Sequence, residues 1–293
     1  MLNKFLNKII CGDALQTLAL LPENSVHLII TSPPYNLNVQ YANHHDELPY
    51  EEYLAWMAKV WAECHRVLVE GGRLCINIGE NKRQNISVPT FSAFIQQCVE
   101  LKMLYRGTII WNKNSAAKHC AWGSWNSPSN PHLVPRHEYI IVFSKGRYKL
   151  DGKESDNTLD SDGKEFMEST RSVWSFGTES RQRIGHPAPF PVALPRRLIQ
   201  FYSYKRQIVL DPFAGSGTTG VAALLLERRF ILIDNSKTYC DLACSRLNEL
   251  AAQQRLFADS ISRVETIELS DIASDIAINA TLHANGLHNS DAF

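Results

Sequence analysis

The first segment of the chain whose residue types indicate a reactive site is Ser32, Pro33, Pro34 and Tyr35. They directly follow Val26–Thr31 (VHLIIT), an apolar run that is typical of a buried strand. The two prolines fix the backbone and lack N–H donors, so the carbonyls beside them can face a ligand. Ser32 adds a hydroxyl acceptor, and Tyr35 adds a flat face on which a ring could stack, a contact worth about 1–3 kcal/mol.

This arrangement suits a reaction at an amino group attached to an aromatic base. Such a nitrogen is a poor nucleophile because its lone pair is delocalised into the ring. Two acceptors bound to its two hydrogens would favour a pyramidal nitrogen with a more localised lone pair. A proline-rich turn with a core tyrosine is the alternative interpretation, and the segment in isolation does not decide between the two.

A glycine-rich turn late in the chain predicts a site for a nucleoside cofactor. Ile208–Gly220 reads IVLDPFAGSGTTG, in which an apolar strand passes through the turn into a helix. Glycines in this position let a ligand approach the backbone at a helix N-terminus. The next predicted strand ends at Asp234, roughly 20 residues on, where a carboxylate suits the two hydroxyls of a ribose. The turn lacks the third glycine of a dinucleotide site and the Lys-Ser/Thr pair of a phosphate loop, and a tight turn without a ligand is the alternative.

Apolar runs and amphipathic segments alternate along the chain, which predicts an α/β fold with a mostly parallel sheet. Gly71–Gly72 is interpreted as the stop signal of the first long helix. The predicted strands are Val26–Thr31, Arg73–Ile78, Gly107–Trp111, Tyr139–Ser144, Ile208–Asp211 and Phe230–Asp234. The predicted helices are Tyr50–Leu68, Phe91–Leu101, Pro191–Tyr204, Gly217–Glu227 and Lys237–Ala252.

The region from Asn112 to about Ser180 differs from the rest of the chain. It is rich in Gly, Ser, Asn and Pro, has little periodicity, and is predicted to be an irregular insertion. Leu101–Lys149 contains eight Lys or Arg residues and one acid, Glu138, although the whole chain has zero formal net charge. Any nucleic-acid surface must therefore be local.

The overall composition is that of a globular protein, with 44% hydrophobic and 20% charged residues and an isoelectric point near 7.1. The seven cysteines are scattered and do not complete a metal site, so reduced thiols and no metal are expected. No signal-peptide pattern and no membrane-length apolar run is visible, which predicts a cytoplasmic protein that does not bind membranes.

Together these segments resemble the amino-methylating DNA methyltransferases, which modify cytosine N4 or adenine N6. Ser32–Tyr35 matches the catalytic motif of this family, and Asp211–Thr219 matches its S-adenosylmethionine loop. Gly12–Leu15 and His186–Pro191 provide two further matches. The catalytic motif precedes the cofactor loop, with a variable region between them, which is the order of the β subgroup. The resemblance spans about Ile9 to Leu247.

The resemblance implies the Rossmann-like fold of S-adenosylmethionine-dependent methyltransferases, with a doubly wound sheet. Ser32 and the Pro33 carbonyl would accept hydrogen bonds from the target amino group, next to Pro34, and Tyr35 would stack on a base that has left the duplex. The methyl group would pass directly to nitrogen, without a covalent enzyme–base intermediate. The residues implied in binding the cofactor are Asp13, Asp211, Phe213, Gly215, Gly217, Thr218 and Asp234.

The first residue of the catalytic motif bears on the target base. In this family a serine leans towards cytosine N4, whereas Asp or Asn leans towards adenine N6. Ser32 therefore favours a cytosine-N4 methyltransferase, with adenine N6 as the alternative. An RNA or protein amide methyltransferase, or a nucleotide-binding regulator without catalysis, would be a rival class.

Double-stranded DNA is the expected partner, with a cognate restriction endonuclease and a second copy of the chain as further candidates. Trp111, Trp122 and Trp125 are expected to pack in the interior rather than to contact bases. The candidate DNA-binding residues, which would neutralise phosphates or read base edges, are Lys113, Lys118, Arg136, Arg181 and Arg183.

These features divide the chain into three predicted regions. Residues 1–111 and 181–252 would form the catalytic and cofactor-binding domain, residues 112–180 an inserted target-recognition region, and residues 253–293 an acidic C-terminal tail. The interpretation requires the fold to bring Ser32–Tyr35 and the glycine-rich turn side by side.

Overall fold

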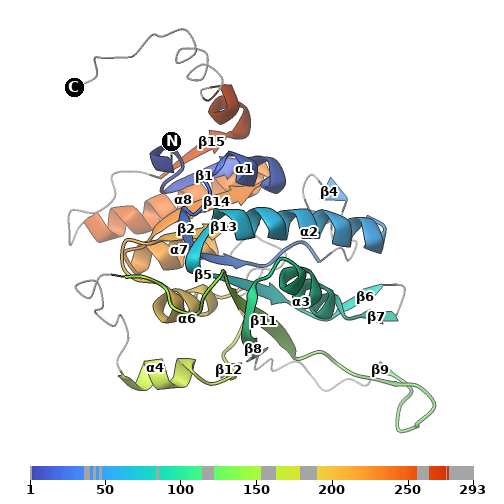
Figure 1. The fold of residues 1–293 in the computed structure, drawn as a ribbon. Coiled ribbons are helices and arrows are strands. Elements are labelled where there is room, and N and C mark those ends of the chain that lie inside the picture. The colour runs from blue at the N-terminus through green and yellow to red at the C-terminus, as the bar shows by residue number, and fades with distance from the viewer. Residues whose placement is uncertain are drawn as a thin grey trace, which may run out of the picture.

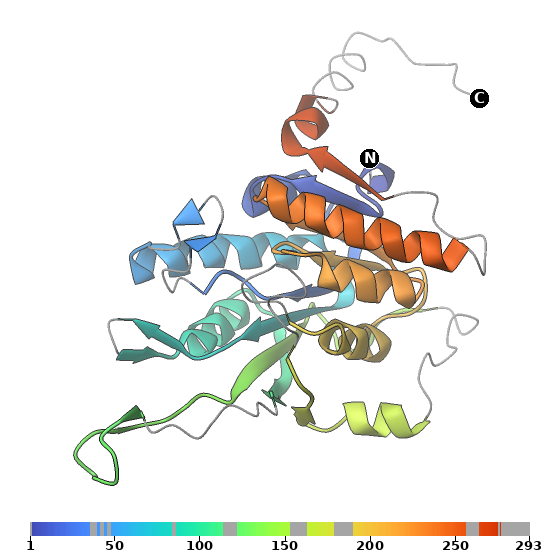
Figure 2. The ribbon, with the colours of Figure 1, turned by 180° about the vertical axis from the view of Figure 1, so that it is seen from behind.

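The computed structural model describes residues 2–35, 40–41, 44–45, 48–83, 86–113, 122–152, 163–178, 190–255, 264–274 and 276. A twisted central sheet carries helices on both faces (Figure 1 and, from behind, Figure 2). The strand order is β12 (Val173–Ser175), β8 (Leu104–Asn112), β11 (His137–Ser144), β5 (Leu68–Ile78), β2 (Val26–Thr31), β13 (Ile208–Asp211), β14 (Arg229–Asp234), β1 (Lys8–Cys11) and β15 (Glu265–Glu268). Strand β11 is antiparallel to both neighbours, and every other adjacent pair is parallel.

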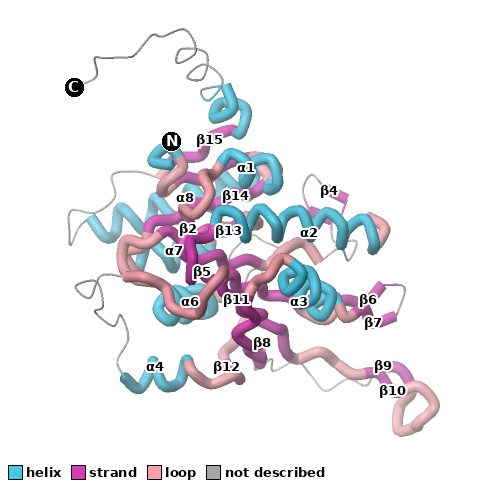
Figure 3. Tube along the Cα trace, in the orientation of Figure 1, coloured by secondary structure: helices cyan, strands magenta, loops and turns pink. Residues whose placement is uncertain are grey.

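The helices form two layers around this sheet (Figure 3). One layer contains α1 (Ala14–Leu20), α2 (Tyr50–Val67) and α3 (Thr90–Glu100), and the other contains α6 (Ala193–Tyr202), α7 (Thr218–Leu225) and α8 (Lys237–Arg255). The remaining elements are η1 (Leu2–Lys4), α4 (Gly163–Ser169) and three short ribbons, β3 (Gln40–Tyr41) with β4 (His44–His45), β6 (Asn81–Arg83) with β7 (Ile86–Val88), and β9 (Trp122–Gly123) with β10 (Pro131–His132).

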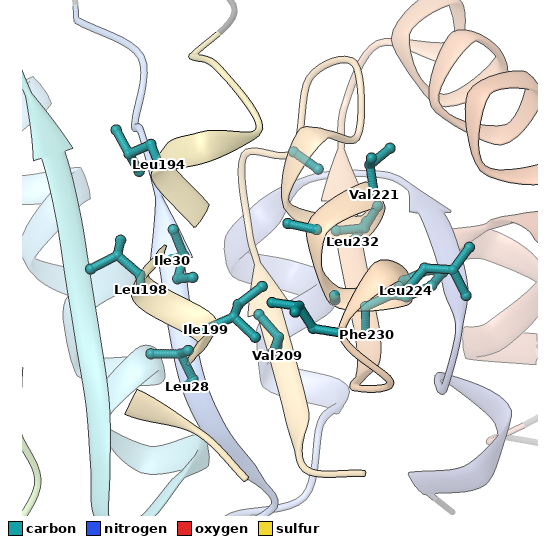
Figure 4. Close-up of a cluster of buried hydrophobic side chains, with 14 of the residues drawn as sticks. Leu28, Ile30, Leu194, Leu198, Ile199, Val209, Val221, Leu224, Phe230 and Leu232 are labelled. Carbon is teal, nitrogen blue, oxygen red and sulfur yellow. The ribbon is translucent and has the colours of Figure 1, made fainter. Parts of the chain in front are cut away.

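The two-residue period of a strand explains why these apolar runs form the centre of the sheet. Leu28 and Ile30 pack in the core beneath α6 and α7, whereas Ile29 between them packs in the core beneath α2. Figure 4 shows the first of these cores, with Leu198 of α6 beside β2. Because helices cover both faces, every position of such a strand is buried and the sequence is apolar throughout. The predicted doubly wound α/β fold is confirmed.

The predicted stop signal at Gly71–Gly72 is wrong, because both glycines lie inside β5 and α2 ends at Val67. Gly71 has a φ of +76°, and a Cβ there would lie 2.0 Å from the carbonyl oxygen of Lys149. These glycines therefore permit the close approach of the chain that follows β11.

The predicted insertion, residues 112–180, contributes more to the sheet than an irregular region would. It supplies β11, which pairs with both β5 and β8, and the short parallel strand β12. The acidic tail, in turn, contains β15, which pairs with β1 at the sheet edge, and Ile272 is buried there. Both segments therefore contribute strands and apolar residues to the central sheet.

The structure tests two expectations about side chains, the burial of the tryptophans and the state of the cysteines. Trp111 is buried as expected, but Trp125 is 80% exposed, so the expectation that it packs in the interior is wrong. The side chain of Trp122 lies outside the described residues. The described cysteines are all free thiols, and no helix among the described residues has the length and apolarity that crossing a bilayer requires.

Candidate active site

The two sequence motifs lie side by side, as the interpretation requires. Strands β2 and β13 pair in parallel, with Leu210 opposite Ile29, so the segments that follow them leave the same edge of the sheet. The chain continues from β2 through α2 to β5 on one side, and from β13 through α7 to β14 on the other. Such a reversal of strand order is where open α/β sheets bind their ligands. We call Ser32–Tyr35 the proline corner and Asp211–Thr218 the glycine turn.

Asp211 organises the glycine turn from beneath. Its side chain is fully buried, and its two oxygens accept hydrogen bonds from the Phe213 N–H (3.1 Å) and the Thr219 hydroxyl (2.6 Å). Burial raises the pKa of this carboxyl from 3.8 to about 6, against the lowering effect of these neutral donors. Because no part of this residue is exposed, Asp211 shapes the turn rather than presenting a carboxylate to a ligand.

The glycines of the turn permit a backbone that other residues would resist. Gly215 and Gly217 have φ values of +50° and +77°, in the left-handed region. A Cβ at Gly217 would also lie 2.7 Å from the Cβ of Ala243 on α8. Helix α7 begins at Thr218 directly after the turn, so its N-terminal backbone faces the same edge as the proline corner.

Two carboxylates stand at the carboxyl ends of β14 and β1, the two strands that follow β13 in the sheet. Asp234, at the end of β14, accepts hydrogen bonds from the N–H groups of Gly215 (2.8 Å) and Ser236 (2.9 Å), and burial raises its pKa. Asp13, after β1, caps α1 by accepting the Gln16 N–H at 2.9 Å and is partly exposed. Strands β14 and β1 are adjacent and parallel, so both acids line one edge beside the glycine turn.

Arg246 of α8 is a residue of this turn that sequence reasoning missed. Its guanidinium donates to the Ser216 carbonyl (2.5 Å), to the Ser216 hydroxyl (2.9 Å) and to the Thr218 hydroxyl (3.4 Å). A single arginine on an amphipathic helix gives no sequence signal for this role. It therefore binds residues of the glycine turn that Asp211 does not contact through hydrogen bonds.

The proline corner is held by α2. The Tyr53 hydroxyl donates to the Pro34 carbonyl at 2.7 Å, and the Ser32 hydroxyl lies 3.4 Å from the Tyr35 hydroxyl. Pro33 is buried, while Ser32 and Tyr35 are partly exposed. The hydroxyl and the aromatic ring predicted to meet a base therefore lie together on one face of the corner.

A polar cluster that the sequence did not reveal surrounds the Tyr35 hydroxyl. This hydroxyl donates to Glu138 Oε2 at 3.3 Å, and the same oxygen accepts from Asn77 Nδ2 at 2.6 Å. Lys113 forms an ion pair with the other Glu138 oxygen. Glu138 is the second residue of the antiparallel strand β11, so its side chain reaches the edge at which the parallel strands end. We call Tyr35, Asn77, Lys113 and Glu138 the tyrosine cluster.

The predicted DNA-binding residues have different surroundings. Lys113 pairs with Glu138 and is therefore part of the tyrosine cluster, while Arg136 is exposed just before β11. Lys118, Arg181 and Arg183 lie outside the described residues, as do residues 186–189 of the motif before α6.

The site has the chemistry that an S-adenosylmethionine molecule requires. Asp234 offers a carboxylate for a ribose, the turn brings glycine backbone to a helix N-terminus, and Phe213 packs on Trp56 of α2 with ring centroids 5.7 Å apart. The aromatic pair adds an apolar wall beside the polar groups. The described residues contain no cluster of His, Cys, Asp and Glu suited to a metal ion.

Comparison with known proteins identifies the family. A family model of DNA methylases that modify N6 or N4 matches residues 26–245. The type II methyltransferase M.MjaVI of Methanocaldococcus jannaschii is 37% identical over 165 residues, which cover 56% of this chain and 83% of the relative. The DNA adenine methyltransferase YhdJ of Escherichia coli is 31% identical over 258 residues, which cover 82% of each chain.

A solved structure agrees with these relatives. A candidate DNA modification methylase from Thermus thermophilus, in complex with S-adenosyl-L-methionine, superposes with a TM-score of 0.69 and 29% identity, over 89% of this chain and 99% of the other. The predicted cofactor is therefore confirmed. The chain belongs to the S-adenosylmethionine-dependent DNA methyltransferases that methylate exocyclic amino groups of bases.

Proposed function

We propose that this enzyme methylates the exocyclic N4 amino group of cytosine in double-stranded DNA. The observation that carries the proposal is Ser32, which stands at the carboxyl end of β2 beside the glycine turn and offers a hydroxyl where the adenine-specific pattern has Asp or Asn. The match to DNA methylases favours DNA over the RNA or protein amide that the proline corner left open.

The residues of the proline corner would act on the target amino group by accepting its hydrogens. Ser32 Oγ and the Pro33 carbonyl each take one hydrogen bond, which localises the nitrogen lone pair and directs it at the methyl donor. S-adenosylmethionine supplies an electrophilic methyl carbon on a sulfonium. The C–S bond breaks as the N–C bond forms, the sulfur becomes a neutral thioether, and the nitrogen then loses one proton to solvent or to an acceptor of the corner. Positioning and the loss of a buried positive charge provide the catalysis.

The target base must leave the duplex to reach this corner, because neighbouring bases cover both faces of its amino nitrogen and one of its two amino hydrogens is paired. Tyr35 is partly exposed and held by the tyrosine cluster, so it offers the stacking face that such a base needs. Asp13, Phe213, Gly215, Gly217, Thr218 and Asp234 would hold the cofactor, while Asp211 supports the turn from the core.

Adenine N6 is the second candidate, because the similar protein YhdJ is named as a DNA adenine methyltransferase. Mass spectrometry of nucleosides separates the two. We expect N4-methylcytosine, without N6-methyladenine, in digested DNA from a methylation-deficient host that expresses the enzyme. N6-methyladenine alone would overturn the cytosine proposal.

The Ser32→Ala variant tests the role of the hydroxyl. We expect the turnover number to fall about 100-fold, as for other lost transition-state hydrogen bonds, with unchanged affinity for S-adenosylmethionine. Ser245→Ala, which alters an exposed serine on α8, is the matched control and should retain full activity. A weaker cofactor affinity in Ser32→Ala would instead place this hydroxyl in the cofactor site.

We extend the proposal to a restriction–modification setting, because M.MjaVI is named as a type II methyltransferase. Such an enzyme modifies one short recurring sequence, which a cognate endonuclease would share. Sequencing that reports modified positions in the same host DNA should reveal that sequence. Modification scattered over unrelated sequences would contradict the setting.

A further inference from the structure

The ribbon of β9 and β10 and its flanks, residues 122–136, form a hairpin that projects from the body of the molecule. Figures 1 and 2 show it at the same side as the ribbons β3–β4 and β6–β7, which follow the carboxyl ends of β2 and β5. We call residues 122–136 the projecting hairpin. It leads directly into β11, where Glu138 contacts Tyr35.

The projecting hairpin exposes large apolar side chains. Trp125 is 80% exposed and Leu133 is 84% exposed, whereas Trp61, Trp111 and Trp174 are among the most deeply buried side chains of the described residues. Apolar groups on a projecting element, rather than scattered over a surface, mark a binding surface. Trp125 therefore differs from these buried tryptophans, and its exposure on a projecting element is typical of a side chain that contacts a binding partner.

Hydrogen bonds within the tip hold it in one shape. The Ser124 N–H donates to the Asn130 carbonyl at 2.9 Å, and the Asn130 N–H donates to the Ser124 hydroxyl at 3.0 Å. Gly123 has a φ of +79°, and a Cβ there would lie 2.1 Å from the Asn130 carbonyl oxygen, so the two strands approach as closely as glycine permits. Trp125 is thus displayed on a defined turn.

The charge of this region fits a polyanion. The sequence from Lys113 to His137 contains no Asp or Glu, while it contains three Lys or Arg and three His residues. Glu138 lies five positions after Leu133, so even a fully extended chain places Leu133 within about 18 Å of the tyrosine cluster. The exposed apolar groups and the methylation site would therefore meet the same stretch of a bound duplex.

We propose that the projecting hairpin binds the DNA substrate and that Trp125 and Leu133 contact its bases next to the target, replacing the stacking that is lost when the target base leaves the duplex. The inference rests on the proposed function, because it assumes that the base is extruded. Apolar side chains inserted between base steps are an established means of unstacking DNA, and aromatic rings stack on unpaired bases.

A second copy of the chain is the rival occupant of this surface. DNA is favoured because the surrounding sequence lacks acids altogether, which suits phosphates, and because the hairpin continues into the strand that carries Glu138. A dimer surface would need no such relation to the catalytic edge.

The decisive experiment compares Trp125→Ala/Leu133→Ala with Met167→Ala, which removes a side chain that is 65% exposed on α4. The substrates are two oligonucleotide duplexes that contain the sequenced methylation site, one fully paired and one with the target base mispaired. On the paired duplex we expect the double variant to lose about tenfold in kcat/KM. On the mispaired duplex, where the base is already unpaired, we expect a loss under about threefold. Met167→Ala should match the wild type on both.

Equal losses on the two duplexes, or no loss on either, would overturn the inference. If the wild type does not act on the mispaired duplex, fluorescence anisotropy with the paired duplex decides, and unchanged affinity of the double variant refutes the proposal. A wild-type dimer that the double variant converts to a fully active monomer in sedimentation velocity would assign the surface to a second copy. Failure of the proposed function is separate, because it would appear in the wild type's own methylated product.

Discussion

The glycine turn and the tyrosine cluster meet at the same edge of the sheet, yet their carboxylates are stabilised by different means. In the glycine turn, Asp211 is fully buried and binds neutral donors, the Phe213 N–H and the hydroxyl of Thr219. In the tyrosine cluster, Glu138 forms an ion pair with the ammonium of Lys113 and accepts a hydrogen bond from Asn77. The first arrangement ties the glycine turn to the stability of the core, and the second places a charge pair beside the tyrosine on which we propose that the target base stacks.

Gly217→Ala should give the largest effect, by breaking the glycine turn. The new Cβ would lie 2.7 Å from the Cβ of Ala243, at a φ of +77° that side chains resist. We expect a loss of about 1–3 kcal/mol in the free energy of unfolding and a drop of at least about tenfold in affinity for S-adenosylmethionine. Urea denaturation and titration calorimetry measure the two. Gly177→Ala, with open space around an exposed glycine, is the control. Full cofactor affinity in Gly217→Ala would show that the turn tolerates a side chain.

Glu138→Gln should give an intermediate effect, confined to the proline corner. The substitution keeps the shape but removes the charge that binds Lys113, which is left without its counter-ion near the Tyr35 hydroxyl. We expect kcat/KM for DNA to fall about tenfold, with unchanged affinity for S-adenosylmethionine, in steady-state and binding assays. Glu80→Gln, which alters the acid bound to the Tyr139 hydroxyl, is the matched control. Equal effects of the two substitutions on kcat/KM would contradict a specific role of Glu138 at the site of the target base.

The effect of Asp211→Asn should be confined to a change in the pH dependence of stability. Burial raises the pKa of Asp211 from 3.8 to about 6, so the folded state holds this proton more tightly than the unfolded state. The contribution of Asp211 to stability is therefore complete below about pH 4 and is lost as pH rises through 6. The asparagine variant lacks this loss, so its free energy of unfolding relative to the wild type should rise by about 2–3 kcal/mol between pH 4 and pH 7. Urea denaturation across this range measures the difference, and a constant difference would contradict the buried, neutral-donor environment.

The sequence predicted most of the fold because its strands are short apolar runs with both faces buried. Ile208–Asp211 was predicted with the bounds that the structure has, and Phe230–Asp234 with one residue fewer. The prediction that Gly71–Gly72 ends a helix is wrong, because a glycine pair is also what a positive φ and a close backbone approach inside a strand require. The edge strand β15 was missed, because its alternating residues sit among the charges of an acidic tail.

The sequence by itself determined the two motifs of the site and the strands that carry them, because each motif consists of consecutive residues whose backbone restrictions are local. The tertiary structure alone decided what surrounds them. Glu138 lies 103 residues from Tyr35, and Arg246 lies 30 residues from Ser216. Glu138 reaches the proline corner only because β11 runs antiparallel to β5, which brings its first residues to the edge where the other strands end. Strand direction is set by packing of the whole sheet, so no local pattern of residues could have placed that carboxylate beside the tyrosine.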